Sequence, residues 1–307
     1  AGAAGRRPVL LSPVPASVRG AAPGPRAARP VVVEKGDFRF ACDERGLSAL
    51  GPARDPYKAT VMPSAGPAGG PPPVLGLAVS YWTDGDGAWT DLGPRGPEWA
   101  ASPEAGTASY RSGGPDAPVR AVESFRTDGR VLDWTVEVET TGAAPVEIGD
   151  LAVAVPAAGP YGEDPARIFE HGFLRHAFVS GAGSFVYFVR ASGAPPYLVM
   201  TARPGTKLEY RAGSGRGGER LFVHSGASGP AEKRGTWRQA HTALKLAAAG
   251  RAGSRVSYGF RFRWAGSYDE LRDVLYDEGL FDVRVVPGMT VPEDLFVRFS
   301  LRTKARV

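Results

Sequence analysis

The fold of this chain is decided by residues 258–304, which read YGFRFRWAGSYDELRDVLYDEGLFDVRVVPGMTVPEDLFVRFSLRTK. The first part alternates aromatic residues with glycine and arginine, which is the period-two pattern of a strand with one buried and one solvated face. The aromatic residues of this predicted strand are Tyr258, Phe260, Phe262 and Trp264. A strand with one apolar face requires a partner layer, so it should belong to a larger sheet.

A short helix is predicted directly after this strand. Ser267 and Glu270 have the spacing of a capping box, and Gly279 suits the left-handed position after a last helical turn. The helix carries an apolar stripe that should pack on the sheet, formed by Tyr268, Leu271, Val274 and Leu275. Beyond it, residues 295–302 predict a final strand whose apolar face is made by Leu295, Val297, Phe299 and Leu301.

Residues 258–304 resemble the amino-terminal region of a large bacterial family that is catalogued as a domain of unknown function and described as six-hairpin-glycosidase-like. Three upstream stretches strengthen the resemblance, which extends from about Phe38 to Lys304: PVEIGDLAVAVP, FLRHAFVSGAGSFVYFVRASGAPPYLVMTARPGTKLEY and TWRQAHTALKL. It implies a galactose-mutarotase-like β-supersandwich that leads into an (α/α)6 toroid of the kind that hydrolyses glycosidic bonds. This chain is expected to hold only the sandwich.

The predicted fold class is therefore mostly β, a supersandwich of two large antiparallel sheets with a short helix near the carboxyl end. The 41 glycines and 28 prolines among 307 residues support this class, because they favour many turns over long helices. We expect the two sheets to bury facing rows of side chains, such as Leu132, Trp134 and Val136 opposite Phe185, Tyr187 and Val189.

Three regions are expected along the chain. Residues 1–30 are rich in proline, alanine and arginine and predict a flexible arm. Residues 31–286 should form the supersandwich, and residues 287–307 a final strand that leads toward a downstream domain missing from this chain. The arm is typical of a protein that has lost a secretory leader, which favours a secreted or extracytoplasmic location, although a fragment boundary would explain it equally well.

Several classes of protein are disfavoured by the composition. The net charge of +5 suggests nucleic-acid binding, but the arginines are scattered outside the amino terminus, so no nucleic-acid partner is predicted. No apolar run approaches the length of a membrane span, so no membrane partner is predicted either. Cys42 is the only cysteine, which excludes an intramolecular disulfide and a cysteine-based zinc site, and we expect it to pack in a strand.

No metal and no cofactor is predicted. His171 and His176 are spaced poorly for a shared ion, whether the segment is a strand or a helix. Oxygen-rich side chains at Asp84, Asp86 and Asp91 could attract calcium, but their spacing falls short of an EF-hand and favours a hairpin turn. The glycine-rich stretches lack the strand and helix that a nucleotide-binding loop requires.

Paired carboxylates are the usual catalytic groups of glycosidases, so acidic residues are the natural catalytic candidates. A predicted strand carries Asp133, Glu137 and Glu139 on one face, and a predicted helix carries Asp269, Asp273 and Asp277. Solvated faces explain both rows more simply. No catalytic residue is therefore predicted, and the fallback candidates are three acids in or near a loop, Glu163, Asp164 and Glu170.

The segment TWRQAHTALKL contains the best candidates for sugar contact. Trp237, Arg238 and His241 combine an aromatic ring with hydrogen-bonding groups, and sugars present apolar C–H faces together with hydroxyls. A tryptophan packed in the core and an arginine in an ion pair would account for the same residues.

Three functional hypotheses follow. The leading one, carried by the family resemblance, is a non-catalytic amino-terminal sandwich domain of a secreted glycoside hydrolase that packs on a catalytic toroid. The second is an independent carbohydrate-binding module, which six tryptophans and ten tyrosines in a β fold suggest. The third is a self-sufficient carbohydrate enzyme, either mutarotase-like or a hydrolase. In each case the expected ligand is an oligosaccharide or polysaccharide.

Overall fold

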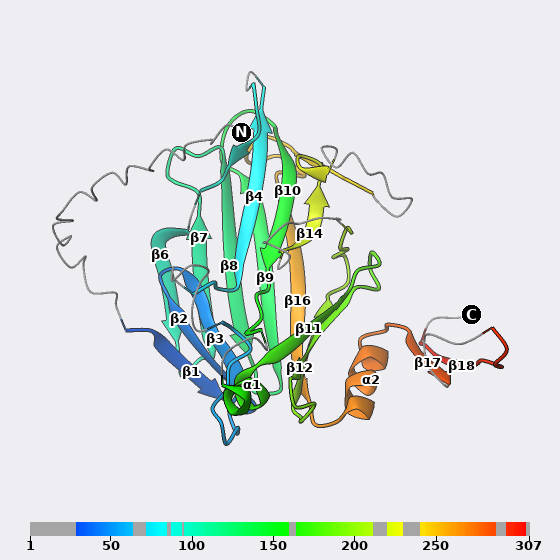
Figure 1. Ribbon diagram of the computed structural model, residues 1–307. Coiled ribbons are helices and arrows are strands. Elements are labelled where there is room, and N and C mark those ends of the chain that lie inside the picture. The colour runs from blue at the N-terminus through cyan, green and yellow to red at the C-terminus, as the bar shows by residue number, and fades with distance from the viewer. Residues whose placement is uncertain are drawn as a thin grey trace, which may run out of the picture.

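The computed structural model describes residues 29–63, 72–84, 87–93, 95–159, 164–210, 220–229, 240–286 and 293–304. In these ranges the protein is mostly β, with two large antiparallel sheets packed over a common core and a short helix near the carboxyl end (Figure 1). The predicted fold class is confirmed. The predicted flexible arm lies almost entirely outside the described residues.

The larger sheet has eight strands among the described residues, in the order β11-β12-β13-β16-β9-β8-β7-β6. Their bounds are β6 Arg95–Ser102, β7 Thr107–Ser112, β8 Val119–Thr127, β9 Val131–Thr140, β11 Phe173–Phe178, β12 Phe185–Arg190, β13 Tyr197–Ala202 and β16 Arg255–Ala265. The predicted strand at residues 258–264 is β16, which lies between β13 and β9 in the middle of this sheet.

The second large sheet is smaller and has five strands among the described residues. Four of them follow the order β14-β10-β4-β5, and β15 also pairs with β10. Its strands are β4 Gly76–Thr83, β5 Thr90–Asp91, β10 Val146–Ala154, β14 Arg220–Ser225 and β15 Leu244–Leu246. A third, three-stranded sheet at the amino end consists of β1 Val31–Lys35, β2 Phe38–Asp43 and β3 Gly46–Pro52. Helix α1 spans Pro165–His171 and precedes β11.

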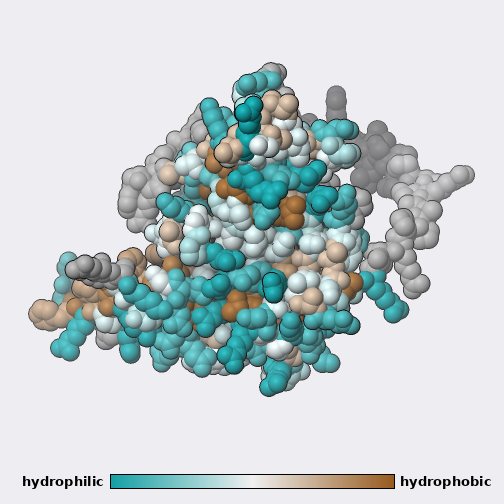
Figure 2. All heavy atoms as spheres, turned by 180° about the vertical axis from the view of Figure 1, so that it is seen from behind, coloured by the Kyte–Doolittle hydropathy of each residue, from teal (hydrophilic) through white to brown (hydrophobic). Residues whose placement is uncertain are grey.

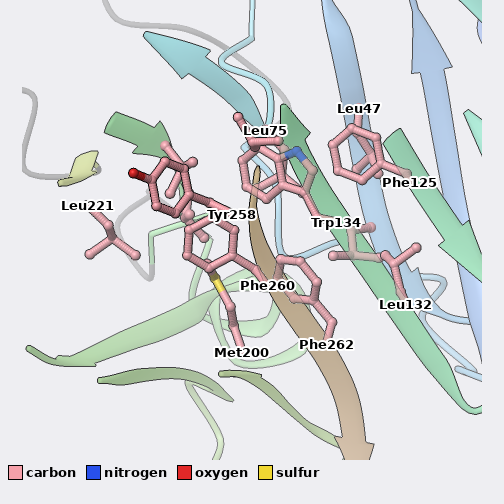
Figure 3. Close-up of a cluster of buried hydrophobic side chains, with 14 of the residues drawn as sticks. Leu47, Leu75, Phe125, Leu132, Trp134, Met200, Leu221, Tyr258, Phe260 and Phe262 are labelled. Carbon is pink, nitrogen blue, oxygen red and sulfur yellow. The ribbon is translucent and has the colours of Figure 1, made fainter. Parts of the chain in front are cut away.

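The core lies where the two large sheets face each other. Strand β9 alternates buried and partly exposed residues, and Trp134 stands opposite Phe260 of β16, with 5.6 Å between the ring centroids. Figure 3 shows this aromatic cluster, in which Leu132, Tyr258 and Phe262 come from the same two strands. Leucine and valine side chains of β10 and β14 complete the core from the smaller sheet.

The predicted facing rows are wrong in two respects. Strands β9 and β12 belong to the same sheet, and β12 buries Val186 and Phe188 in the main core while Phe185 and Tyr187 pack on the opposite face. The sequence of β12 is apolar on both faces, so alternation could not select the register. The face of β12 that packs in the core also buries Arg190. Its guanidinium forms an ion pair with buried Asp55, with 3.0 Å between Nη2 and Oδ1.

Helix α2, Tyr268–Asp277, begins and ends where the sequence predicts. Ser267 Oγ accepts a hydrogen bond from Glu270 N at 3.1 Å, and Gly279 has a φ of +80°. Three residues of the predicted stripe are buried against Val199 and Ala265, namely Leu271, Val274 and Leu275. The fourth, Tyr268, is 58% exposed because it stands at the first position of the helix, before the buried face begins.

The chain continues from α2 into a two-stranded sheet, β17 Asp282–Val286 and β18 Arg298–Arg302, which is separate from the two large sheets. This hairpin projects beside α2 at the carboxyl end of the molecule (Figure 1). The observed final strand, β18, is therefore shorter than the predicted strand at residues 295–302. Its predicted apolar face is exposed rather than buried, as the burial of Leu295, Val297, Phe299 and Leu301 shows.

Candidate functional site

Six polar side chains form one hydrogen-bonded group at the edge of the five-stranded sheet. We call it the Glu209 cluster, and its members are Glu209, His224, Ser225, His241, Thr242 and Tyr258. Strand β14 lies at this edge and supplies His224 and Ser225, while Tyr258 comes from β16 of the opposite sheet. The cluster thus links the two sheets of the sandwich.

A β-bulge in β14 determines which way the two central residues point. The register between β10 and β14 shifts, so that His224 pairs with Leu151 and Ser225 pairs with Asp150. Leu151 belongs to the core, so His224 lies on the core side of the sheet and Ser225 lies on the other side. The two neighbouring side chains therefore reach opposite faces of one strand.

Glu209 is the acceptor at the centre of the cluster. The backbone of Glu209 forms an isolated β-bridge with Phe222 of β14, so it partly covers the free edge of that strand. The carboxylate accepts hydrogen bonds from the Ser225 hydroxyl at 2.6 Å, from Thr242 N at 3.1 and 3.2 Å, and from the Thr242 hydroxyl. These bonds fix residues 241–242 against the sheet.

The hydrogen-bond pattern assigns the histidine tautomers. The Thr242 hydroxyl gives its single proton to Glu209, so it accepts from His224 Nδ1–H at 2.8 Å, and His224 Nε2 then accepts the Tyr258 hydroxyl proton at 2.6 Å. By the same reasoning Ser225, which donates to Glu209, accepts from His241 Nδ1–H at 2.8 Å. The protons of the network therefore point toward the Glu209 carboxylate.

The electrostatics agree with a neutral imidazole and a neutral phenol. Burial lowers the pKa of His224 below its ordinary value, although the negative charge of Glu209 acts in the opposite direction. Burial, and then the charge of Glu209, raises the pKa of Tyr258 to about 12. Near neutral pH both groups are therefore held in the uncharged form that their mutual hydrogen bond requires.

The cluster contains the residue types of a nucleophilic triad but not its arrangement. Ser225 stands between the carboxylate and His241 and is 0% exposed, so its hydroxyl cannot attack a bound substrate. The His241 ring lies against Gly229, where a Cβ atom would be 2.1 Å from Nδ1. The arrangement orders the chain around His241 rather than activating a nucleophile.

The predicted sugar-contact residues are only partly placed. His241 belongs to the Glu209 cluster, whereas Trp237 and Arg238 lie outside the described residues. Sequence reasoning missed Glu209, His224, Ser225 and Tyr258. They are scattered over about fifty positions and no local motif groups them. The pairing of β14 with β10 and residue 209, and the packing of β16 against β14, bring them together.

Two of the three fallback carboxylates, Asp164 and Glu170, lie in the described residues, near opposite ends of α1. Glu163 lies outside the described residues. Asp164 is the N-cap of α1 and accepts a hydrogen bond from Ala166 N at 3.0 Å, which gives it a local structural role. Glu170 lies in the last turn of α1, with its carboxylate 3.9 Å from His171.

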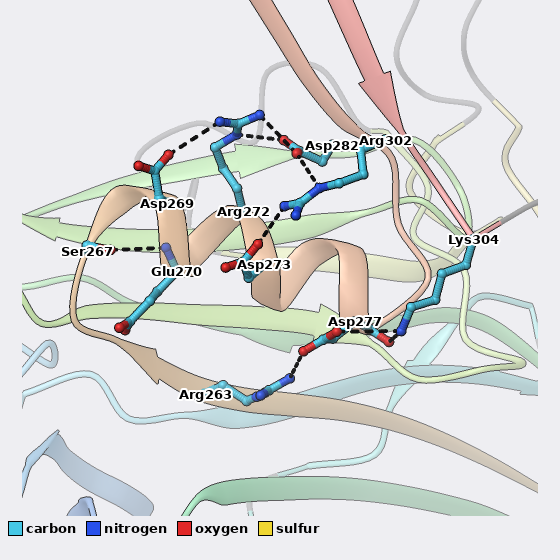
Figure 4. Close-up of polar contacts among 10 residues, drawn as sticks. All are labelled: Arg263, Ser267, Asp269, Glu270, Arg272, Asp273, Asp277, Asp282, Arg302 and Lys304. Carbon is cyan, nitrogen blue, oxygen red and sulfur yellow. Dashed lines mark hydrogen bonds and ion pairs between the residues drawn. The ribbon is translucent and has the colours of Figure 1, made fainter.

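The two acidic rows lie in ion pairs. On β9, Asp133 bonds Arg261 at 3.1 Å and Glu139 bonds Arg255 Nε at 3.1 Å, which lowers the pKa of Glu139. On α2, Asp269 contacts Arg272, Asp273 contacts Arg302 and Asp277 contacts Arg263 and Lys304, as Figure 4 shows. Neither row therefore presents an unpaired carboxylate pair to a substrate.

The other candidate residues have separate environments. Cys42 is buried in β2, as predicted, and Asp86 lies outside the described residues while Asp84 and Asp91 lie inside them. His171 contacts the Tyr57 ring, and His176 stacks on Tyr187 with 4.7 Å between the centroids. In the described part of the chain no three His, Cys, Asp or Glu side chains gather around a common point as metal ligands would.

An unusual surface lies on the β17–β18 hairpin. Cross-strand pairs place Asp282 beside Arg302 on the face that contacts α2, and Val283 beside Leu301 on the opposite face. The side chains on that opposite face are open to solvent: Val283 is 54%, Phe299 76% and Leu301 46% exposed. Phe296, which precedes β18, is 97% exposed. We call Val283, Phe299 and Leu301 the hairpin apolar face.

Figure 2 views the molecule from behind and shows hydrophobic atoms on the projection at the left, where the hairpin lies. Neighbouring apolar side chains that are exposed together are typical of an interaction site. Within the described ranges, neither helix is long and apolar enough to cross a bilayer.

No family model matches this sequence, and no curated protein matches it. Among solved structures, a polysaccharide lyase is similar to 83% of the chain, with a TM-score of 0.57 and 14% sequence identity. The chain spans 36% of the length of that lyase. An α-galactosidase from Lactobacillus brevis matches 81% of the chain and 42% of its own length, with a TM-score of 0.41 and 6% identity. An α-galactosidase from Geobacillus stearothermophilus matches 80% of the chain and 41% of its own length, with a TM-score of 0.43 and 9% identity.

The two α-galactosidase likenesses are too weak to support a conclusion. The likeness to the lyase concerns the fold, because 14% identity does not transfer an activity. The resemblance to the six-hairpin-glycosidase-like family therefore rests on the sequence motifs. The chain has a mostly β sandwich fold similar to part of a polysaccharide lyase.

Proposed function

We propose that this chain is a non-catalytic amino-terminal sandwich domain of a secreted glycoside hydrolase, and that it packs on a separate (α/α)6 catalytic domain of the same polypeptide. The observation that carries the proposal is the hairpin apolar face. A two-stranded sheet is marginally stable by itself, and this one turns its charged face inward and its apolar face outward. Such an arrangement is favourable when another surface covers the apolar side.

Two further observations support a domain of the same polypeptide as the cover. The chain spans 36% of a polysaccharide lyase with a similar fold, so sandwiches of this shape occur within larger carbohydrate-active proteins. The family resemblance independently implies a sandwich followed by a toroid.

The test compares the chain with the longest natural polypeptide that contains it. Both are incubated with plant, bacterial and fungal glycans, and the release of reducing ends is measured. Activity in the longer polypeptide alone supports the proposal. Turnover by the chain itself would contradict it, would favour a self-sufficient hydrolase or mutarotase-like enzyme, and would direct mutagenesis to Asp164, Glu170 and His241.

Docking can be tested separately with Phe299→Ser in the longer polypeptide. We expect the polar side chain to weaken the domain interface and lower the temperature at which the two domains unfold together. The matched control is Phe169→Ser, which replaces another exposed phenylalanine on α1. Equal effects of the two substitutions would contradict docking through the hairpin.

A second candidate is an independent carbohydrate-binding module. It is favoured by four aromatic rings on the outer face of β11 and β12, in the stacked pairs His176–Tyr187 and Phe178–Phe185. This candidate predicts saturable binding of a glycan by the chain. Binding that is lost in Phe178→Ala or Trp237→Ala, with folding retained, would favour it over the leading proposal.

A further inference from the structure

A pocket lies at the end of the eight-stranded sheet where β9 ends and β8 and β16 begin. Its volume is about 490 Å³, which is within the range of small-ligand sites. Backbone and side chains of the β15–β16 connection form one wall. The residues that line the pocket are Arg120, Glu139, Thr140, Thr141, Ala249, Gly250, Arg251, Ser254 and Arg255.

The connection that forms this wall is well fixed. Ala249 N donates to Gly142 O at 2.9 Å, and Ser254 N donates to Arg251 O at 3.1 Å. Gly250 adopts a φ of +74°, and no atom would contact a Cβ placed on it, so the space above its backbone is open. A ligand could therefore approach the main chain at Gly250 without displacing a side chain.

The pocket carries more positive than negative charge. Its single lining carboxylate, Glu139, accepts from Arg120 at 3.2 Å and from Arg255 Nε at 3.1 Å, so both guanidinium groups are held in defined positions. Glu137, just outside the lining, is 3.9 Å from Arg255. Arg251 has no ion-pair or hydrogen-bond partner for its guanidinium among the described residues. One arginine is thus available to a ligand beside two that are already oriented.

We propose that this pocket binds a sugar unit that carries an anionic substituent, with Arg251 as the principal contact to the acid group. A guanidinium presents planar, paired N–H donors that match the oxygens of a carboxylate or sulfate. The volume accommodates a sugar ring, and Thr141, Ser254 and the Gly250 backbone supply neutral polar surface. The inference rests on the proposed carbohydrate role and specifies the chemical class of the glycan.

The experiment is calorimetric titration of the chain with four probes: an oligogalacturonide, a sulfated oligosaccharide, a neutral oligosaccharide of the same length, and inorganic phosphate. We expect one of the two acidic saccharides to bind, the neutral one not to bind, and the affinity to fall as salt is added. The preferred acidic probe distinguishes a carboxylate from a sulfate.

Three variants locate the binding. Arg251→Ala should weaken the affinity about tenfold or more, because a charge-assisted hydrogen bond is lost, and Arg251→Lys should retain part of it. The matched control is Arg130→Ala, which removes an exposed arginine at the opposite end of β8 and β9. Arg251 is unpaired among the described residues, and Arg130 is exposed and interacts electrostatically with Asp128 in the same turn, so each variant should fold normally.

Three outcomes would overturn the inference: equal binding of the neutral saccharide, binding of phosphate as tight as that of any saccharide, or an Arg251→Ala variant that binds like Arg130→Ala. The titration uses the chain alone and needs no catalytic domain. If no acidic saccharide binds in the titration, the docking and turnover measurements still test the proposed domain role. If docking through the hairpin fails, the titration still tests the pocket.

Discussion

At the scale of single residues, Glu209 has the most concentrated role, because its carboxylate accepts from two hydroxyls and one backbone N–H. Glu209→Gln would replace one acceptor oxygen with an NH₂ group that faces a donor. We expect a loss of about 1–3 kcal/mol in the free energy of unfolding, measured by urea denaturation. Glu104→Gln, at an exposed carboxylate in a turn, should change it by no more than about 0.5 kcal/mol. Similar values for both variants would show that the cluster does not hold the 241–242 segment.

Tyr258 provides a pH-dependent test of the same cluster. Its pKa is raised from 10.0 to about 12, so the unfolded chain loses this proton at lower pH than the folded chain. The contribution to stability is complete below pH 10 and is lost as the pH rises toward 12. In Tyr258→Phe this part of the alkaline decline should be absent, and the tyrosinate absorbance that appears last in the wild-type titration should be missing. A wild-type and a variant curve of the same shape would argue against a buried, neutral Tyr258.

At the scale of elements, helix α2 was predictable because its signals are local. Its cap, its apolar stripe and its terminal glycine all lie within thirteen positions of the sequence, and each is a property of neighbouring residues. Strand β12 was not, because both of its faces are apolar apart from Arg190. Its orientation depends on the ion pair with Asp55, which lies 135 positions away. Local pattern cannot contain that information.

The attachment of the hairpin to α2 depends on Asp282, which is nearly fully buried. Its carboxylate accepts two bonds from Arg272, at 2.7 and 2.9 Å, and one from Arg302 at 3.0 Å (Figure 4). We expect Asp282→Asn to destabilise the hairpin by about 1–3 kcal/mol, because the buried carboxylate that Arg272 and Arg302 share loses its charge, although Asp269 and Asp273 still contact these arginines. Hydrogen exchange of the β17 and β18 amides would measure the effect.

Asp273→Asn is the matched control for that experiment. Asp273 is exposed and, within the described part of the chain, its one ion pair is with Arg302, at 2.7 Å, so its loss should cost less than about 1 kcal/mol. If the β17 and β18 amides exchange at the same rate in both variants, the hairpin is held by something other than Asp282.

At the scale of the whole molecule, the mostly β class could be predicted because turns and alternation recur along the chain, and the family resemblance implied the sandwich. The Glu209 cluster and the arginine pocket could not be predicted. Tyr258 was assigned correctly to a buried strand face, but its hydrogen bond to His224 joins two different sheets. Arg120 likewise lies far along the chain from Arg251 and Arg255, and the three arginines meet only when β8, β9 and β16 are paired. Sites assembled by pairing across a sheet have no signature in a single segment.

The buried pair Asp55–Arg190 connects distant parts of the molecule and allows a prediction at this scale. Each side chain is only 2% exposed, and Asp55 also accepts from Ala59 N at 2.8 Å while Arg190 donates to Glu170 O at the end of α1. Asp55→Asn keeps the first of these bonds but leaves the guanidinium buried without a counter-charge. We expect a loss of about 3–5 kcal/mol in the free energy of unfolding.

The double variant Asp55→Asn with Arg190→Met distinguishes a charge effect from a packing effect. It removes the uncompensated charge and keeps an apolar stem between the Tyr57 and Phe173 rings, which Arg190 now contacts at 5.4 and 5.3 Å. It should therefore be more stable than Asp55→Asn alone, and chemical denaturation would measure the difference. Glu98→Gln, which breaks the exposed pair with Arg111, serves as a control and should cost less than about 1 kcal/mol. A double variant less stable than the single one would mean that Arg190 stabilises the core mainly through its bond to α1 and its ring contacts, and that the charge of Asp55 is secondary.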